Sequence, residues 1–150
     1  MINQQTQHDI IDHPNHYQRH SRKLDCTIEC RRDLARHMSY DLGNMVKYVF
    51  RHQSKNQPEI DLQKAANYAD DMHERDNTCR YTTSYQHTLK RIHQYCEALA
   101  DESPTNAETE FWQSVSPTYD EHLELWLPRI RAYPESMSKI IHHIIQEENL

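Results

Sequence analysis

Glycine is almost absent from the 150-residue chain, which contains only one. Folds rich in β-structure rely on glycine at hairpin turns and bulges, where the backbone often needs a positive φ. Helical proteins can instead end their helices with Asn, Ser and Pro. The scarcity of glycine therefore predicts an all-α fold.

The chain also lacks a long apolar run and an excess of basic residues. Its most apolar stretch, Ile140–Ile145, is interrupted by two histidines, and residues 1–12 lack the apolar core of a signal peptide. We therefore expect no membrane association and a cytoplasmic location. The formal net charge of −6 disfavours direct nucleic-acid binding over the main surface, but it suits a basic protein partner.

Cysteine is scarce too, because four thiols at ordinary spacings are too few for a disulfide scaffold. Cys26 and Cys30 could be drawn with His13 and His16 as a four-ligand zinc site. However, the two cysteines are one helical turn apart and have apolar neighbours. We expect reduced, buried thiols and no zinc.

Apolar residues recur at helical spacing along most of the chain. A polar turn near Pro58 predicts that two successive helices form an antiparallel hairpin. Thr105 followed three residues later by Glu108 matches a capping box, which marks another helix start. The expected helices cover about residues 24–38, 40–53, 59–75, 82–100, 116–130 and 135–147.

The pattern predicts a helical bundle built on that antiparallel helix hairpin. A polar, histidine-rich arm is expected at residues 1–22, and the helical domain at residues 23–76. A helical C-terminal extension of unknown role follows at residues 77–150, with the boundary near Asp76–Thr78.

One face of the helix at 40–53 is unusually basic. Its polar members fall three or four residues apart, so they share one side of the helix. Neighbouring cations repel each other by about a few tenths of a kcal/mol per exposed pair, so an anion should compensate them. A phosphate fits, because Arg51 can grip it with two hydrogen bonds and Tyr48 can stack on a base. The face consists of Asn44, Lys47, Tyr48, Arg51 and Lys55.

A second interpretation of the same face is a solvated basic edge without a ligand. Charged helix faces are common, and the following helix offers carboxylates at Asp61, Asp70 and Asp71, with Glu29 a further candidate. Spacing alone leaves the two interpretations open.

Four sequence blocks occur in order between residues 12 and 75, and the basic face is one of them. With these blocks the segment resembles the domain-of-unknown-function family 3310 of phages and prophages, which includes the nucleotide kinase of short-tailed coliphages. The blocks are His13-Pro14-x-His16-Tyr17, Asp25-Cys26-x-x-Glu29, Gly43-Asn44-x-x-Lys47-Tyr48-x-x-Arg51-x-x-x-Lys55 and Asp61-Leu62-x-Lys64-Ala65-x-x-Tyr68.

The resemblance implies an oligomeric, phage-type nucleotide-binding protein. It further implies a deoxynucleoside monophosphate kinase that works with a nucleotide donor and Mg²⁺ but without a Walker A loop, which a chain with one glycine cannot form. Glu29 and Asp61 would hold the Mg²⁺. The implied phosphate-binding residues are Asn44, Lys47, Tyr48, Arg51, Lys55 and Lys64.

The resemblance also assigns a catalytic group and a clamp. Arg51, Lys47 and His16 would act on the transferred phosphate. His13, His16 and Tyr17 would close over the site.

Residues 76–150 carry no such resemblance and leave a second function open. The acidic balance and this unplaced half favour a non-enzymatic phage anti-defence protein, similar to an anti-CRISPR inhibitor, that binds a host nucleic-acid-binding protein complex. Under either hypothesis the protein would act in the cytoplasm of the host cell.

Overall fold

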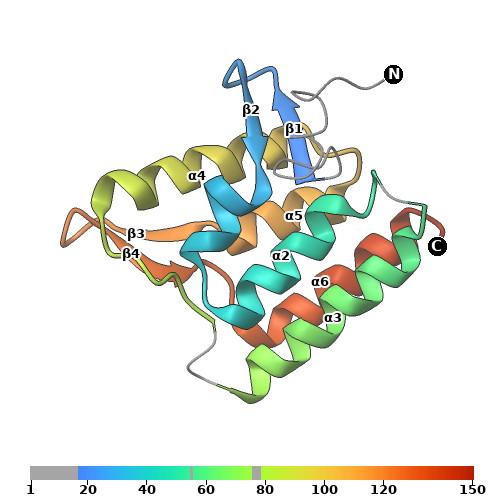
Figure 1. Ribbon diagram of the computed structural model, residues 1–150. Coiled ribbons are helices and arrows are strands. Elements are labelled where there is room, and N and C mark those ends of the chain that lie inside the picture. Colours follow the sequence, from blue (N-terminus) through green and yellow to red (C-terminus); the bar gives the residue numbers. More distant parts are fainter. Residues whose placement is uncertain (1–16, 55, 76–78) are drawn as a thin grey trace, which may run out of the picture.

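A computed structural model describes residues 17–54, 56–75 and 79–150 of the chain. This part is mostly helical and contains two small antiparallel sheets of two strands each (Figure 1). His13, His16 and Lys55 lie outside the described residues. The elements are β1 (Gln18–Ser21), β2 (Cys26–Glu29), a π-helical turn (Cys30–Leu34), a 3-10 turn (Ala35–His37), α2 (Tyr40–Arg51), α3 (Pro58–Glu74), α4 (Gln86–Asp101), α5 (Asn106–Val115), β3 (Pro117–Asp120), β4 (Leu125–Ile130) and α6 (Pro134–Glu147).

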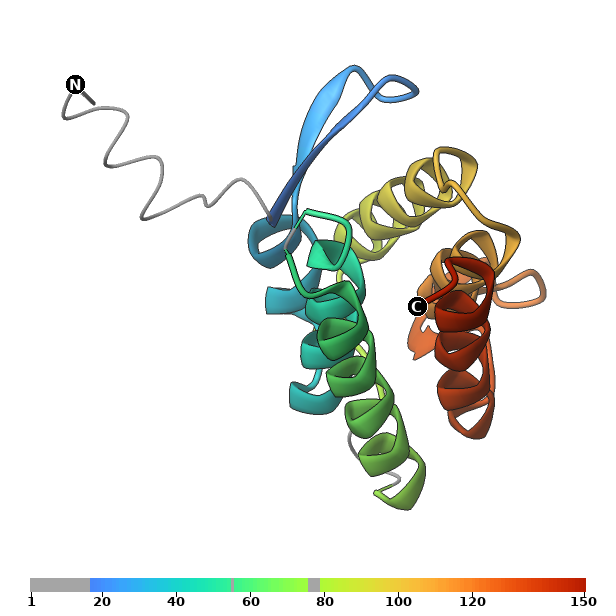
Figure 2. The ribbon, with the colours of Figure 1, turned by 90° about the vertical axis from the view of Figure 1, so that its right-hand side faces the viewer.

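The helices pack around one hydrophobic core, in the spatial order α2, α3, α6, α5 and α4. α2 and α3 form an antiparallel hairpin, α6 lies along α3, and α5 contacts both α6 and α4 (Figures 1 and 2). Phe50 and Trp112 meet edge to face within the core, where both are fully buried. None of the helices in the described part of the chain combines the length and the apolar character needed to cross a bilayer.

Four of the predicted helices are confirmed, namely those at 40–53, 59–75, 82–100 and 135–147, which correspond to α2, α3, α4 and α6. The helix start that the capping-box pattern predicts at Thr105 is also confirmed, although the carboxylate of Glu108 binds Arg19 and Gln53. There the side chain of Thr105 accepts a hydrogen bond from the backbone N–H of Glu108 at 3.2 Å.

The predicted helix at 24–38 is wrong over its first half. Residues 26–29 form β2, which pairs with β1 in a register that places Ser21 opposite Cys26 and Gln18 opposite Glu29. Thr27 and the fully buried Ile28 are β-branched, which favours an extended backbone. The boundary predicted at residue 22 therefore falls inside this hairpin.

The predicted helix at 116–130 is wrong as well, because this stretch forms the β3–β4 hairpin. Pro128 would interrupt a helix, since it lacks an N–H and its ring clashes with the preceding turn. In β4 its carbonyl oxygen instead accepts a hydrogen bond from the N–H of Tyr81 at 3.0 Å. The fold is thus mixed rather than purely helical.

Both hairpins turn without glycine. Asp25 between β1 and β2 has a φ of 51°, and Glu124 before β4 has a φ of 53°. The left-handed region costs an ordinary L-residue roughly 1–2 kcal/mol, and Asp tolerates it better than Glu. The absence of glycine therefore raises the free energy of these turns but does not prevent them.

Residues 80–82 form hydrogen bonds with both the N-terminal and the C-terminal half of the chain. The N–H of Ser39 donates to the carbonyl of Arg80 at 2.8 Å. The hydroxyl of Tyr81, a nearly fully buried residue, donates to the carbonyl of Val115 at 2.6 Å. This segment consequently contacts elements on both sides of it in the sequence.

We predict that Glu124→Gly stabilises the protein by about 0.5–1 kcal/mol, because it removes the backbone strain at this turn. The free energy of unfolding, measured by urea denaturation, should rise. Glu121→Gly is the matched control in the same exposed turn, where φ is not positive. It should lower the stability slightly, and an equal effect of both substitutions would contradict the strain argument.

Candidate anion-binding site

The basic face predicted on α2 lies beside α3. Asn44, Lys47, Tyr48 and Arg51 follow one another along the helix at the expected spacing. The side-chain amide of Asn44 donates to the backbone carbonyl of Tyr40 at 2.9 Å. Asn44 thus contributes to the first turns of its own helix, while the other three residues gather further along it.

Three cationic side chains make cation–π contacts with the ring of Tyr48. The Nζ of Lys47 and the Cζ of Arg51 each lie 4.6 Å from the ring centroid, and the Nζ of Lys64 lies 5.4 Å from it. Tyr68 on α3 stacks on the same side chain with an interplanar angle of 14°. Each cation–π contact contributes about 0.5–1 kcal/mol at exposed sites, which helps to hold like charges together.

Arg51 is fixed by an ion pair that joins α2 to α3. Its Nε and Nη2 donate to Oδ1 of Asp61 at 3.2 and 2.9 Å, and its Nη1 donates to the hydroxyl of Tyr17 at 2.6 Å. Burial lowers the pKa of Arg51, but the hydrogen bonds to Asp61 and Tyr17 outweigh it, so the pKa ends above its ordinary value. The guanidinium is therefore charged at every relevant pH and held in one orientation.

A cavity of about 460 Å³ opens beside this ion pair, at the turn between α2 and α3. Oδ2 of Asp61 is buried and has no hydrogen-bond partner among the described residues. A buried, unpaired carboxylate oxygen is costly, so this atom is suited to receive a ligand. The cavity is lined by Arg51, Ser54, Asn56, Gln57, Asp61 and Lys64.

The local charge is positive although the protein as a whole is acidic. Arg51 and Asp61 neutralise each other, as the second interpretation of the basic face anticipates for this pair. In the described ranges, however, neither Lys47 nor Lys64 forms an ion pair. Lys64 lines the cavity, and Lys47 contacts the same Tyr48 ring outside the cavity lining, so one unpaired positive charge borders the cavity and a second lies near it.

The implied metal ligands Glu29 and Asp61 come from different elements. Glu29 ends β2, and its Oε2 lies 3.7 Å from Nη1 of Arg32. Asp61 lies in the first turn of α3 and binds Arg51. Each carboxylate thus already faces a guanidinium, and their joint role as Mg²⁺ ligands stays a prediction.

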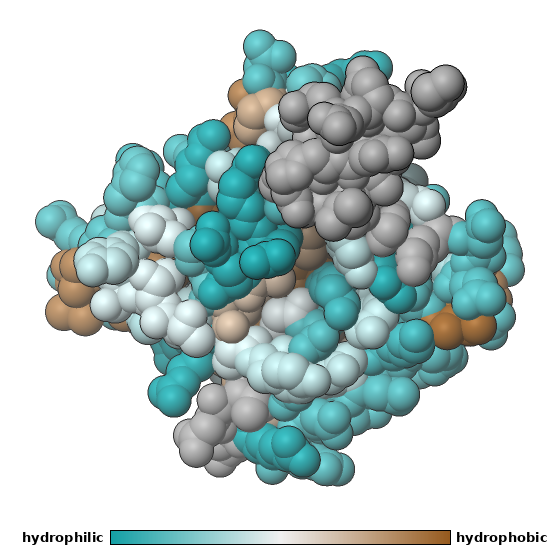
Figure 3. Space-filling model, in the orientation of Figure 1, coloured by the Kyte–Doolittle hydropathy of each residue, from teal (hydrophilic) through white to brown (hydrophobic). Residues whose placement is uncertain are grey.

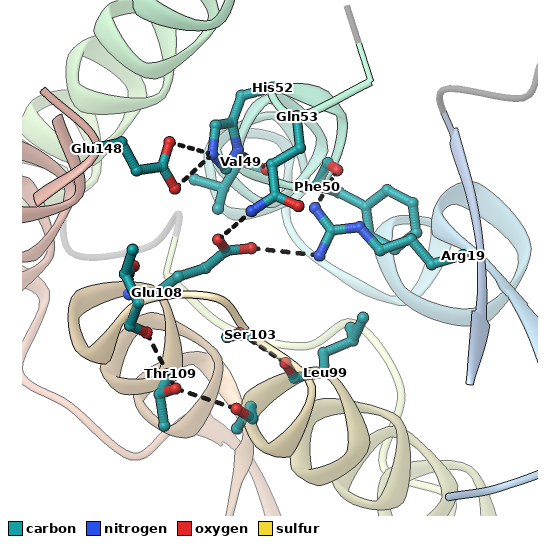
Figure 4. A network of polar contacts seen from close by, with 12 residues as sticks. Arg19, Val49, Phe50, His52, Gln53, Leu99, Ser103, Glu108, Thr109 and Glu148 are labelled. Atoms are coloured by element: carbon teal, nitrogen blue, oxygen red, sulfur yellow. Dashed lines mark hydrogen bonds and ion pairs between the residues drawn. The ribbon is translucent and has the colours of Figure 1, made fainter. Parts of the chain in front are cut away.

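A second polar network, which the sequence pattern does not predict, lies where α2 and α6 end and α5 begins (Figure 4). Glu108 is fully buried there and binds both Arg19 and Gln53. His52 faces Glu148. The capping-box pattern located Glu108 on its helix, but no signal in the sequence pairs His52 with a residue 96 positions away.

Residues 11–70 match the model of a protein family of unknown function, DUF3310. The resemblance inferred from the four sequence blocks is thereby confirmed for this segment, which includes α2 and most of α3. No curated protein and no solved structure matches the chain. The matched family is described only as one of unknown function, so the function has to be argued from the site itself.

We predict that Asp61→Asn lowers the free energy of unfolding by about 3 kcal/mol, because it leaves the largely buried Arg51 without its counter-ion. Urea denaturation followed by circular dichroism measures this loss. Glu59→Gln, an exposed carboxylate in the same helical turn, is the control and should change stability by less than about 0.5 kcal/mol. Similar losses in both variants would show that the ion pair is not specifically stabilising.

Proposed function

We propose that the cavity between α2 and α3 binds the phosphate groups of a nucleotide. The observation that carries this proposal is the cluster of three cations around Tyr48, of which Lys47 and Lys64 have no ion-pair partner in the described part of the chain. In a protein with a net charge of −6, such a cluster needs an anion to balance it.

The components of the site suit a phosphate in different ways. Arg51 is held in place by Asp61 and Tyr17, so little side-chain entropy is lost when a ligand arrives. Lys47 and Lys64 are mobile point charges that adapt to the position of the anion. The cavity volume of about 460 Å³ lies within the range of small-molecule sites.

We further propose that the bound nucleotide undergoes phosphoryl transfer. The bond between the terminal phosphorus of a nucleoside triphosphate and its bridging oxygen breaks, and a phosphate oxygen of a deoxynucleoside monophosphate bonds to that phosphorus, which leaves two diphosphates. Such a reaction depends on positioning and charge neutralisation, for which Arg51 and Lys47 are suited. His16, the third catalytic candidate, lies outside the described residues.

The Mg²⁺ implied by the family resemblance fits this site in one respect. Asp61 lines the cavity, and its buried Oδ2, which has no hydrogen-bond partner among the described residues, is an oxygen ligand of the kind that Mg²⁺ prefers. A Mg²⁺ ion carried in by the nucleotide would neutralise charge between its phosphates. Asp61 would then orient the ion while its other oxygen keeps hold of Arg51.

We predict that a nucleotide binds and that Lys64→Glu weakens this binding by about tenfold or more, since it replaces an attractive charge with a repulsive one. Isothermal titration calorimetry with dTMP, dGMP and ATP–Mg²⁺ measures the affinity. Lys90→Glu on α4 makes the same charge change at an exposed position that does not line the cavity, and it should leave binding unchanged.

The same samples test the finer proposal. Incubation with ATP, Mg²⁺ and dTMP or dGMP should yield diphosphates, and Lys64→Glu should slow their formation. Binding without turnover would overturn the kinase proposal and keep the nucleotide site. Absence of both binding and turnover would overturn the two together.

A second function, binding to a host nucleic-acid-binding protein complex, is favoured by a different surface. Leu123 and Leu125 are exposed to 61% and 42% at the turn of the β3–β4 hairpin, where Figure 3 shows an apolar patch at the left edge of the molecule. A contiguous patch of exposed apolar side chains supports a protein-interaction site at this hairpin.

We predict that this hairpin is needed to capture such a complex. In a pull-down of nucleoprotein complexes from host extract, Leu123→Ser with Leu125→Ser should abolish recovery, because the exposed apolar contact is lost. Lys64→Glu should not affect it. Recovery that is equal with all variants, or absent with the unmodified protein, would contradict this function.

A further inference from the structure

Three side chains able to bind a metal converge where α2, α5 and α6 meet (Figure 4). His52 follows the last residue of α2, Glu108 lies in the first turn of α5, and Glu148 follows the last residue of α6. One ligand atom from each lies within 4.8 Å of the other two. None of the three lines the cavity beside Arg51, so this cluster is separate from the candidate anion-binding site.

The hydrogen bonds of His52 define which ring nitrogen can bind a metal. The ring is completely buried, and its Nδ1 contacts the carbonyl oxygen of Val49. A carbonyl oxygen only accepts hydrogen bonds, so Nδ1 carries the proton and donates it. Nε2 of the neutral ring then presents a lone pair, and this tautomer is the one commonly found in metal-bound histidines.

That lone pair faces the carboxylate of Glu148. Nε2 of His52 lies 3.1 and 3.0 Å from its two oxygens, which are themselves acceptors. Acceptors do not approach one another this closely unless a proton or a metal ion lies between them. Either a second ring proton or a metal ion satisfies this requirement.

The buried carboxylate of Glu108 favours a metal ion over a proton at this point. Glu108 is fully buried and faces Arg19 at 3.2 Å, and one of its oxygens lies within 4.8 Å of a ligand atom of His52 and of Glu148. A proton on the imidazole bonds only to Glu148, whereas a metal ion can take both carboxylates and the imidazole as ligands.

We propose that Nε2 of His52 and the carboxylates of Glu108 and Glu148 bind one divalent transition-metal ion of the class of Zn²⁺ or Mn²⁺. Ligand atoms at about 2.0–2.2 Å from such an ion lie roughly 3–4 Å apart, so His52 and Glu148 already have a suitable spacing. Glu108 completes the set with an oxygen that lies within 4.8 Å of the other two ligand atoms. The imidazole nitrogen favours transition metals over Mg²⁺ and Ca²⁺, which prefer oxygen ligands.

The ion joins parts of the chain that are far apart in sequence. His52 belongs to the segment that matches the family model, whereas Glu108 and Glu148 belong to the other half. Because the three ligands are almost enclosed, the site stabilises the fold and does not resemble an open catalytic centre. This inference does not depend on nucleotide binding.

The test uses the full chain after treatment with EDTA and dialysis. Isothermal titration calorimetry with ZnCl₂ and with MnCl₂ should give one ion per chain, and MgCl₂ should give no saturable binding. The midpoint of thermal unfolding should rise by about 5 °C at a 100-fold excess over the dissociation constant. Co²⁺ should give visible absorption bands from the bound ion.

Glu148→Gln keeps the shape of the side chain and should weaken metal binding by about 100-fold and abolish the Co²⁺ bands. Glu147→Gln is the matched neighbour and should retain one ion per chain. His142→Gln with His143→Gln removes two other imidazoles from α6 and should also retain it. Unmodified protein without saturable Zn²⁺ or Mn²⁺ binding, or a Glu148→Gln variant with unchanged affinity, would overturn the proposal and leave an ion pair between His52 and Glu148.

Discussion

The buried carboxylate of Glu108 is the constraint on which the arrangement of the molecule depends. A charge with no exposure to solvent is destabilising by several kcal/mol unless it is paired. Its partners come from separate elements, because Arg19 lies on β1 and Gln53 follows α2. The first hairpin, the end of α2 and the start of α5 must therefore meet at one point.

The parts of the fold that follow from local periodicity could be predicted from the sequence, and the hairpins could not. α2 and α6 carry uninterrupted apolar faces, so their spacing was sufficient. In the β3–β4 stretch, Leu123 and Ile130 also have helical spacing, but Leu123 lies exposed in a turn. The scarcity of glycine does not exclude hairpins in this chain, because Asp25 and Glu124 adopt the left-handed conformation themselves.

The part of the candidate site that lies on the single helix α2 could be predicted from the sequence. The spacing of Lys47, Tyr48 and Arg51 placed them on one side of α2, and Asp61 was correctly named as a candidate counter-ion for this face. The cavity at the following turn depends on how two helices pack, which periodicity does not specify. The contact between His52 and Glu148 depends on the whole tertiary fold.

The position of α6 along α3 has a consequence for the minimal folding unit. α3 is packed between α2 and α6, and it buries Leu62, Ala66 and Met72 within this stack. A polypeptide that ended near residue 76 would leave the α6-facing side of α3 in water. In this protein α6 covers that side, so the C-terminal half belongs to the same folding unit as α2 and α3.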